Sequence, residues 1–134
     1  MPEAGPTILA IDTSTAACSV ALWRDGAVVA ARLEMLGRGH AENLMPMADV
    51  VLEEAGVAAE ALTLVAVTTG PGAFTGLRLG LAAARGLTLA LGVPCAGFTT
   101  TETLAAAVAA EAGEAIVAAL DSKRGDFYVQ VFDA

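Results

Sequence analysis

The sequence predicts an α/β domain built on a five-stranded mixed sheet with flanking helices. Three short β-type runs come first, and the Asp25-Gly26 pair between two of them is a strong hairpin signal. Short buried runs then alternate with segments of helical periodicity, which is typical of parallel strands joined by crossover helices. The predicted order is βββαβαβα, with the first strand between the hairpin and the parallel half of the sheet. The expected strands span 7–12, 18–23, 27–34, 64–68 and 93–98, and the expected helices about 43–55, 75–91 and 101–112.

Glycine and proline residues limit where the first expected helix can begin and end. The run Gly37-Arg38-Gly39 predicts a chain break before it. Pro46 lacks an N–H group and is compatible with this helix only if the helix begins near Asn43 or if its first turn is kinked. Gly56 is the expected stop.

Composition limits the classes of function. The chain has 134 residues, 56% of them apolar, and a formal net charge of -8, so it is poorly suited to holding nucleic acid without a basic partner. Cys18 and Cys95 have no CxxC spacing and are interpreted as buried free thiols. The N-terminus lacks the basic region of a signal peptide and no apolar run is long enough to span a membrane, so we expect a cytoplasmic protein.

The end of the chain repeats its beginning. Residues 116–122 resemble residues 8–13, and Tyr128 and Val129 follow at the spacing of Ser19 and Val20. We therefore predict a complete domain over residues 1–113 and, over 114–134, the first hairpin of a duplicate domain whose remainder is absent from this sequence. Such a hairpin has an open edge that needs a pairing partner.

The glycine-rich segment Gly70–Gly80 (GPGAFTGLRLG) joins a strand to a helix and has three possible roles. It could be a phosphate loop, a tight structural turn or a docking surface. The spacing of Gly70, Gly72 and Gly76 is one residue off the GxGxxG fingerprint, and no lysine follows Gly76 as it would in a P-loop. A tight turn is the better interpretation.

The helix after this turn carries a stripe of small residues, Gly76, Gly80, Ala84 and Thr88, at intervals of four. Glycine inside a helix costs about 1 kcal/mol relative to alanine, so close packing must offset it. The stripe could pack on the chain's own sheet or face a partner, and the two interpretations are compatible because a helix has more than one face.

The motifs resemble one family closely. The order of elements is similar to that of the actin, sugar-kinase and Hsp70 superfamily, whose domains are ribonuclease H-like. The strand motif Ile8–Ser14, the pair Arg38 and His40, the Gly70–Gly80 string and the stretch Asp121–Tyr128 together resemble the TsaB (YeaZ) family. The Gly70–Gly80 string is highly specific, the resemblance covers nearly all of the chain, and family members normally run well beyond this length.

The resemblance implies a role in making N6-threonylcarbamoyladenosine (t6A37) in tRNA. A TsaB protein is regarded as a scaffold without transfer activity of its own; it pairs with the catalytic paralogue TsaD, with the ATPase subunit TsaE as a third component and with tRNA only through the complex. Family members form homodimers, or heterodimers with TsaD, through two helices. Carried to this chain, the predicted interface comprises Leu44, Met47, Gly76, Arg78, Leu79, Gly80, Ala83 and Arg85.

Little catalytic chemistry is expected. The paralogue holds its metal with histidines after the fifth strand, whereas Phe98–Thr103 contains none, so we predict no catalytic residue and no metal site. Asp12 with Thr13 and the matching Asp121 could be a vestigial nucleotide or Mg²⁺ site, or each aspartate could cap a turn. No cofactor is expected in this chain. ATP with Mg²⁺ is possible only in the assembled complex. His40 is expected at a loop or helix start, with an interface role as the alternative.

Two other functions follow from the same comparison of motifs. An ATP-dependent small-molecule phosphotransferase or an ATPase of the same superfamily would use the turn after Asp12. The older description of such sequences as glycoprotease-like has no support here, since neither HExxH nor GxSxG occurs.

Overall fold

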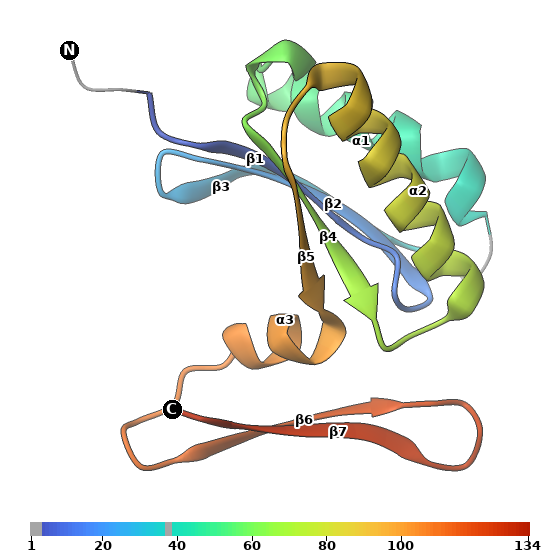
Figure 1. Ribbon diagram of the computed structural model, residues 1–134, viewed down its shortest axis with the longest axis vertical. Coiled ribbons are helices and arrows are strands. Elements are labelled where there is room, and N and C mark those ends of the chain that lie inside the picture. Colours follow the sequence, from blue (N-terminus) through green and yellow to red (C-terminus); the bar gives the residue numbers. More distant parts are fainter. Residues whose placement is uncertain (1–3, 37–38) are drawn as a thin grey trace.

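The central sheet has the predicted topology. The computed structural model describes residues 4–36 and 39–134 and places five strands in the order β3-β2-β1-β4-β5 (Figure 1). Strand β1 runs antiparallel to β2 and parallel to β4, so its predicted place between the hairpin and the parallel half is confirmed. The strands are β1 (Thr7–Asp12), β2 (Ala17–Arg24), β3 (Ala27–Met35), β4 (Leu64–Gly70) and β5 (Cys95–Thr99).

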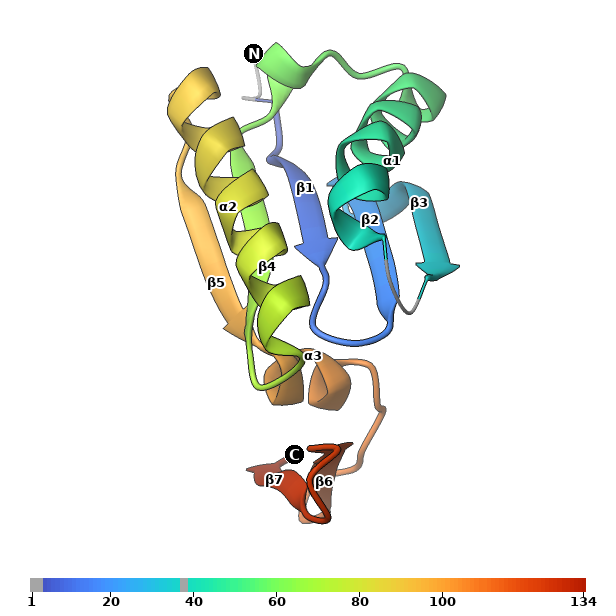
Figure 2. The same ribbon diagram turned by 90° about the vertical axis from the view of Figure 1, so that its right-hand side faces the viewer.

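Two long helices, α1 (His40–Ala55) and α2 (Phe74–Leu91), cover one face of this sheet (Figure 2). The core lies between helices and sheet, because alternate residues of the strands point toward the helices. The fully buried strand side chains are Leu9, Ile11, Cys18, Val20, Leu22 and Val65. A short 3₁₀ turn, η1 (Ala59–Ala61), precedes β4, and the short helix α3 (Thr100–Ala106) lies at the carboxyl end of the sheet.

The first helix begins earlier than expected. It starts at His40 rather than near Asn43, so Pro46 lies inside it. Pro46 is exposed, whereas Leu44, Met47 and other residues on the opposite side are buried in the core. Burial of that apolar side therefore outweighs the loss of one backbone hydrogen bond at the proline. Gly56 ends the helix in the left-handed conformation, as predicted.

Helix α2 matches its expected bounds to within one residue, but helix α3 does not. Helix α3 ends at Ala106, whereas the alanine-rich run predicted a helix as far as Ala112. Residues 107–109 and 111–114 are exposed. Alanine has high helix propensity, but a short helix in water also needs a surface to pack against, and these exposed residues have none.

The last strands, β6 (Ala115–Asp121) and β7 (Phe127–Asp133), form a separate two-stranded sheet beyond α3 (Figure 1). They repeat the β1–β2 arrangement with a shorter turn: Asp12 pairs with Ser19, but Asp121 pairs with Phe127. The predicted equivalence of Tyr128 with Ser19 is therefore wrong by one position, because Phe127 takes that place. The division at residue 113 into two domains stays a prediction.

Part of the expected organisation falls outside the described residues. The chain break predicted at Gly37 and Arg38, and the Arg38 of the quoted motif, lie there. Within residues 4–36 and 39–134, no helix is both long enough and apolar enough to cross a membrane.

Candidate functional site

The glycines of the Gly70–Gly80 segment pack on the turn between β1 and β2. A Cβ added at Gly72, Gly76 or Gly80 would come closer than 3.0 Å to an atom of Ser14 or Thr13. The Ala73 N–H donates to the Ser14 carbonyl at 2.9 Å, and the Thr13 hydroxyl donates to the Gly76 carbonyl at 2.6 Å. The segment is thus a tight structural turn whose helix docks on the chain itself.

The small-residue stripe of α2 faces inward. Gly76, Gly80 and Ala84 are all buried. Of the two interpretations, packing on the chain's own sheet therefore describes this stripe. Any partner surface on α2 must lie on another side of the helix.

Asp12 organises the β1–β2 turn. Its Oδ1 accepts hydrogen bonds from the Ser14 N–H at 3.0 Å, the Ser14 hydroxyl at 2.6 Å and the Thr68 hydroxyl at 2.9 Å. Thr13 is 1% exposed, and its hydroxyl donates a hydrogen bond to the Gly76 carbonyl. This is the geometry of an aspartate that caps a turn, and it leaves Thr13 no free group for a ligand.

Asp121 has the same local role in the second hairpin. Its Oδ1 accepts the Lys123 N–H at 2.8 Å, and its Oδ2 lies 3.6 Å from the Lys123 ammonium. Asp12 and Asp121 line two different hollows, of about 140 and 440 Å³. The structure therefore does not bring the two predicted carboxylates into one cavity, and the described residues contain no cluster of three His, Cys, Asp or Glu side chains able to hold a metal.

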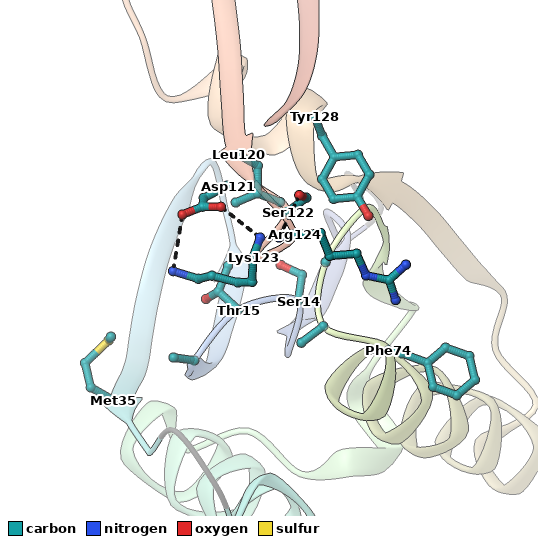
Figure 3. A pocket seen from close by; sticks show the side chains of 13 residues that line it. Ser14, Thr15, Met35, Phe74, Leu120, Asp121, Ser122, Lys123, Arg124 and Tyr128 are labelled. Atoms are coloured by element: carbon teal, nitrogen blue, oxygen red, sulfur yellow. Dashed lines mark hydrogen bonds and ion pairs between the residues drawn. The ribbon is translucent and has the colours of Figure 1, made fainter. Parts of the chain in front are cut away.

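The larger hollow lies between the β1–β2 turn, the start of α2 and the β6–β7 turn (Figure 3). Lys123 lies beside Asp121 in it, whereas the Phe74 side chain points outward. Sequence reasoning named Asp121 alone from this set, although the stretch Asp121–Tyr128 had been singled out as a family motif. The residues that line it are Ser14, Thr15, Ala16, Met35, Gly72, Ala73, Phe74, Leu120, Asp121, Ser122, Lys123, Arg124 and Tyr128.

The predicted interface residues fall into two groups. Leu44, Met47, Gly76 and Gly80 are buried inside the chain. The prediction that these four residues lie at a partner interface is therefore wrong. Leu44 and Met47 pack in the core, and Gly76 and Gly80 pack against Thr13. The other four reach the surface: Arg78 and Arg85 are exposed, and Leu79 and Ala83 are partly buried.

Exposed residues at helical spacing lie along both helices, and we call this set the outer face. Phe74 is 72% exposed with the Arg78 guanidinium 5.2 Å from its ring centre, and Leu89 is 86% exposed. Phe74, Arg78 and Leu79 also line a shallow hollow of about 310 Å³. The outer face comprises Glu42, Met45, Asp49 and Glu53 of α1 and Phe74, Arg78, Ala82, Arg85 and Leu89 of α2.

Charge is segregated on the outer face. Helix α1 contains aspartate and glutamate but no lysine or arginine, and α2 contains Arg78 and Arg85 but no acidic residue. Sequence reasoning missed Phe74 and Leu89 because it followed the small residues. The spacing 74, 78, 82, 85 and 89 was the signal that could have found them.

His40 is a structural residue. It is the first residue of α1, is 7% exposed, and its Nε2 lies 3.1 Å from the Thr15 carbonyl and 3.3 Å from the Ala17 carbonyl. Since both partners are acceptors, Nε2 carries a proton and donates. The helix-start interpretation is confirmed, and the interface alternative is wrong because the side chain is buried.

The fold defines a class of protein. A five-stranded mixed sheet of order β3-β2-β1-β4-β5, covered by α1 and α2 and followed by a second β-hairpin, is the arrangement of an actin-like domain of the actin, sugar-kinase and Hsp70 class. A solved structure, YeaZ from Pseudomonas aeruginosa, matches with a TM-score of 0.89 and 39% identity, over 97% of this chain and 61% of that one.

Sequence comparisons narrow the class. The family model of TsaD, tRNA N6-adenosine threonylcarbamoyltransferase, matches residues 34–133. The tRNA threonylcarbamoyladenosine biosynthesis protein TsaB of Escherichia coli is 40% identical over 90% of this chain and 52% of the relative, and that of Bacillus subtilis is 34% identical over 94% and 55%. The chain thus spans about half the length of these curated relatives. It belongs to the TsaB (YeaZ) family of TsaD-like proteins.

Proposed function

We propose that this chain acts in the threonylcarbamoyladenosine modification of tRNA as a non-catalytic subunit that docks on the catalytic paralogue TsaD. The observation that carries the proposal is the outer face, where Phe74 and Leu89 stand 72% and 86% exposed. Aromatic and arginine side chains are the usual anchors of protein interfaces. The matched relatives are named for tRNA threonylcarbamoyladenosine biosynthesis, and this name is the basis for placing the chain in that pathway.

Two features favour a supporting role over catalysis. The stretch Phe98–Thr103 has no histidine, and its threonines serve structure: the Thr100 hydroxyl donates to the Pro71 carbonyl at 2.6 Å and the Thr101 hydroxyl to Gln130 Oε1 at 2.6 Å. The net charge of -8 disfavours tRNA binding by the chain alone, so tRNA is reached through the complex. TsaE is the proposed third subunit, and a homodimer through the same outer face is the state without TsaD.

Sedimentation of the chain with purified TsaD tests the docking. Arg78→Glu and Leu89→Glu each remove an anchor of the outer face, and we expect association about 30-fold weaker or more. Arg24→Glu is the charge-matched control, because Arg24 is exposed at the end of β2 and lies outside the outer face. Absence of any complex with TsaD, or equal losses from Arg24→Glu and Arg78→Glu, would sink the proposal.

A second candidate is an ATP-dependent phosphotransferase or an ATPase. The hollow of about 440 Å³ favours it, because Lys123 and Arg124 line this hollow beside the turn that carries Ser14. Calorimetry with Mg-ATP tests it, with Arg124→Ala as the variant that should abolish binding. Heat that is unchanged by this variant, or no heat at all, excludes the candidate.

A further inference from the structure

Strand β3 is an open edge of the central sheet (Figure 2). It stands at the end of the strand order β3-β2-β1-β4-β5, and among the described residues no strand pairs with its outer side. Proteins usually protect such an edge by keeping the strand short or by placing proline or lysine in it. Strand β3 has nine residues and contains neither, and its Leu33 and Met35 are 64% and 73% exposed. It can therefore accept a further strand.

The backbone groups of β3 are directed outward at alternate positions. The Leu36 N–H donates to the Ala16 carbonyl at 3.1 Å, so Leu36 and every second residue before it direct their N–H and C=O groups toward β2. The residues between them, Ala31, Leu33 and Met35, direct theirs away from β2. The register shift between β2 and β3 lies near the start of β3, so this stretch is regular. An added strand would form its hydrogen bonds at these three residues.

Two residues of opposite charge stand between these three. Arg32 and Glu34 are opposite buried residues of β2, so both side chains rise on the side of the sheet that α1 covers. Arg32 forms an ion pair with Glu54 of α1, and its guanidinium also donates to the Ala31 carbonyl at 3.2 Å. Within the described part of the chain, Glu34 forms no ion pair. The charges of this edge are thus only partly paired inside the chain.

These charges distinguish the possible registers of two copies of β3. Two identical strands that pair antiparallel are related by a two-fold axis, which passes through the residue that meets itself. An axis at Arg32 or Glu34 puts like charges directly opposite each other, which is destabilising, and an axis at Ala31 leaves both charges opposite uncharged residues. An axis at Leu33 puts Arg32 of each copy opposite Glu34 of the other. In this register the edge is complementary to itself in charge.

We propose that β3 pairs antiparallel with β3 of a second copy of this chain, with Leu33 on the two-fold axis. Leu33 then exchanges both backbone hydrogen bonds with Leu33 of the second copy, and Ala31 pairs with Met35. The Ala31 carbonyl accepts a backbone N–H in place of the Arg32 guanidinium, which turns to Glu34 of the second copy. On the opposite face of the sheet, the exposed Leu33 and Met35 side chains gain neighbours across the new pair of strands.

Helix α1 is compatible with this pairing. The two-fold axis is perpendicular to the sheet, so the α1 helices of both copies lie on the same side of the joined sheet. Val50 of α1 is 40% exposed and lines, with Arg32 and Glu34, a hollow of about 140 Å³ at the open edge. This apolar side chain therefore lies at the boundary with the second copy.

The inference goes beyond the proposed function and does not rest on it, because it uses the edge of the sheet and not the outer face. The pairing leaves Phe74, Arg78 and Leu89 uncovered, so a dimer joined through β3 presents two outer faces. The test variants therefore all carry Leu89→Glu, which removes association through the outer face and leaves the edge of β3 unchanged.

Sedimentation of the 134-residue chain tests the charge complementarity. Arg32→Glu and Glu34→Arg each put like charges opposite each other at both pairs, so each variant should self-associate at least about tenfold more weakly. An equimolar mixture of the two variants should associate like the unaltered chain, because every charge then meets its opposite again. Glu54→Gln is the control: it removes the ion pair inside the chain, keeps β3 intact and should leave association unaltered.

Disulfide cross-linking tests the register without changing a charge. Leu33→Cys in a Cys95→Ser background puts two thiols opposite each other, with Cα atoms about 5.5 Å apart, which a disulfide can span. The remaining Cys18 is buried. We expect a cross-linked dimer on oxidation. Val28→Cys is the control at a position of similar exposure, 61%, but five residues from the axis, so its thiols lie about 34 Å apart and should not cross-link.

A chain that carries Leu89→Glu and stays monomeric at every concentration overturns the proposal. So does a mixture of the two charge variants that associates no better than either alone, or equal cross-linking of Leu33→Cys and Val28→Cys. Cross-linking of Leu33→Cys to TsaD in place of a second copy assigns the edge to that partner and also overturns it. None of these results alters the effect of Arg78→Glu on association with TsaD, so the two proposals fail separately.

Discussion

At the scale of single residues, the docking of α2 depends on the absence of side chains. Gly76 meets the Thr13 carbonyl, Gly80 meets the Thr13 side chain, and Gly72 meets Ser14. The Thr13 hydroxyl closes the contact by donating to the Gly76 carbonyl at 2.6 Å. The helix can therefore approach the turn more closely than ordinary side chains allow, which offsets the cost of glycine inside a helix.

Gly76→Ala should destabilise the protein by about 1 to 3 kcal/mol, because its Cβ meets backbone that cannot move aside. Gly86→Ala is the matched control in the same helix, where an added Cβ meets nothing within 4 Å. It should stabilise the protein by about 0.4 to 1 kcal/mol by restricting the unfolded chain. Urea unfolding measures both, and equal midpoints for the two variants would contradict the account.

Cys18 gives a pH-dependent prediction. Burial, with the carboxylates of Glu34 and Asp12, raises the pKa of the Cys18 thiol. As the pH rises past the ordinary thiol pKa of 9.0, the unfolded chain ionises before the folded one, so the free energy of unfolding falls up to the raised pKa and is unaffected below 9.0. Unfolding curves between pH 7 and pH 11 should show a smaller decline for Cys18→Ala than for Cys95→Ala, whose thiol is exposed. Identical declines would refute this role for Cys18.

Residue roles were partly predictable from the sequence. The turn-capping alternative for Asp12, the buried free thiol at Cys18 and the tight turn at Gly70–Gly80 could be inferred from residue chemistry. The exposure of Cys95 could not, because the residues of β5 do not themselves show that it is an edge strand of the sheet. The interface assignment of Leu44 and Met47 came from the family resemblance, and their burial in the core overturns it.

At the scale of elements, helix α1 shows packing overriding local preference. Pro46 is the seventh residue of this helix, whereas the predicted helix begins only near Asn43. Strand pairing was more predictable, because each register is fixed by which side chains must be buried. Helix α3 differs from its prediction in the opposite direction, because it is shorter than expected. The alanines after Ala106 favour a helix but have nothing to pack against.

Pro46→Ala should therefore stabilise the protein by about 1 to 3 kcal/mol, since it restores one helical hydrogen bond on an exposed side. Pro94→Ala, just before β5, is the control and should give no gain, because that proline lies outside any helix. Thermal unfolding followed by circular dichroism measures both. If neither variant raises the midpoint, α1 accommodates its proline without cost and the explanation fails.

At the scale of the whole molecule, the β6–β7 hairpin is joined to the rest of the chain through α3. Thr101, Ala105 and Ala118 are buried where the helix meets the hairpin. The hydrogen bond from the Thr101 hydroxyl to Gln130 Oε1, at 2.6 Å, fixes β7 to the helix. The repeated β-turn-β pattern predicted that this hairpin exists, but its attachment depends on a pairing of distant residues that no local pattern reveals.

Thr101→Val should loosen this attachment without disturbing the central sheet. The variant keeps the size of the side chain and removes a hydrogen bond of about 0.5 to 1.5 kcal/mol, so amide exchange in β6 and β7 should quicken about two- to tenfold. Thr103→Val is the matched control, because the Thr103 hydroxyl donates at 2.7 Å to the Thr100 carbonyl of its own helix. Exchange in β1 and β4 should be unchanged in both variants. Faster exchange throughout the chain would mean that hairpin and domain unfold as one unit, and that the Thr101 contact is not a local attachment.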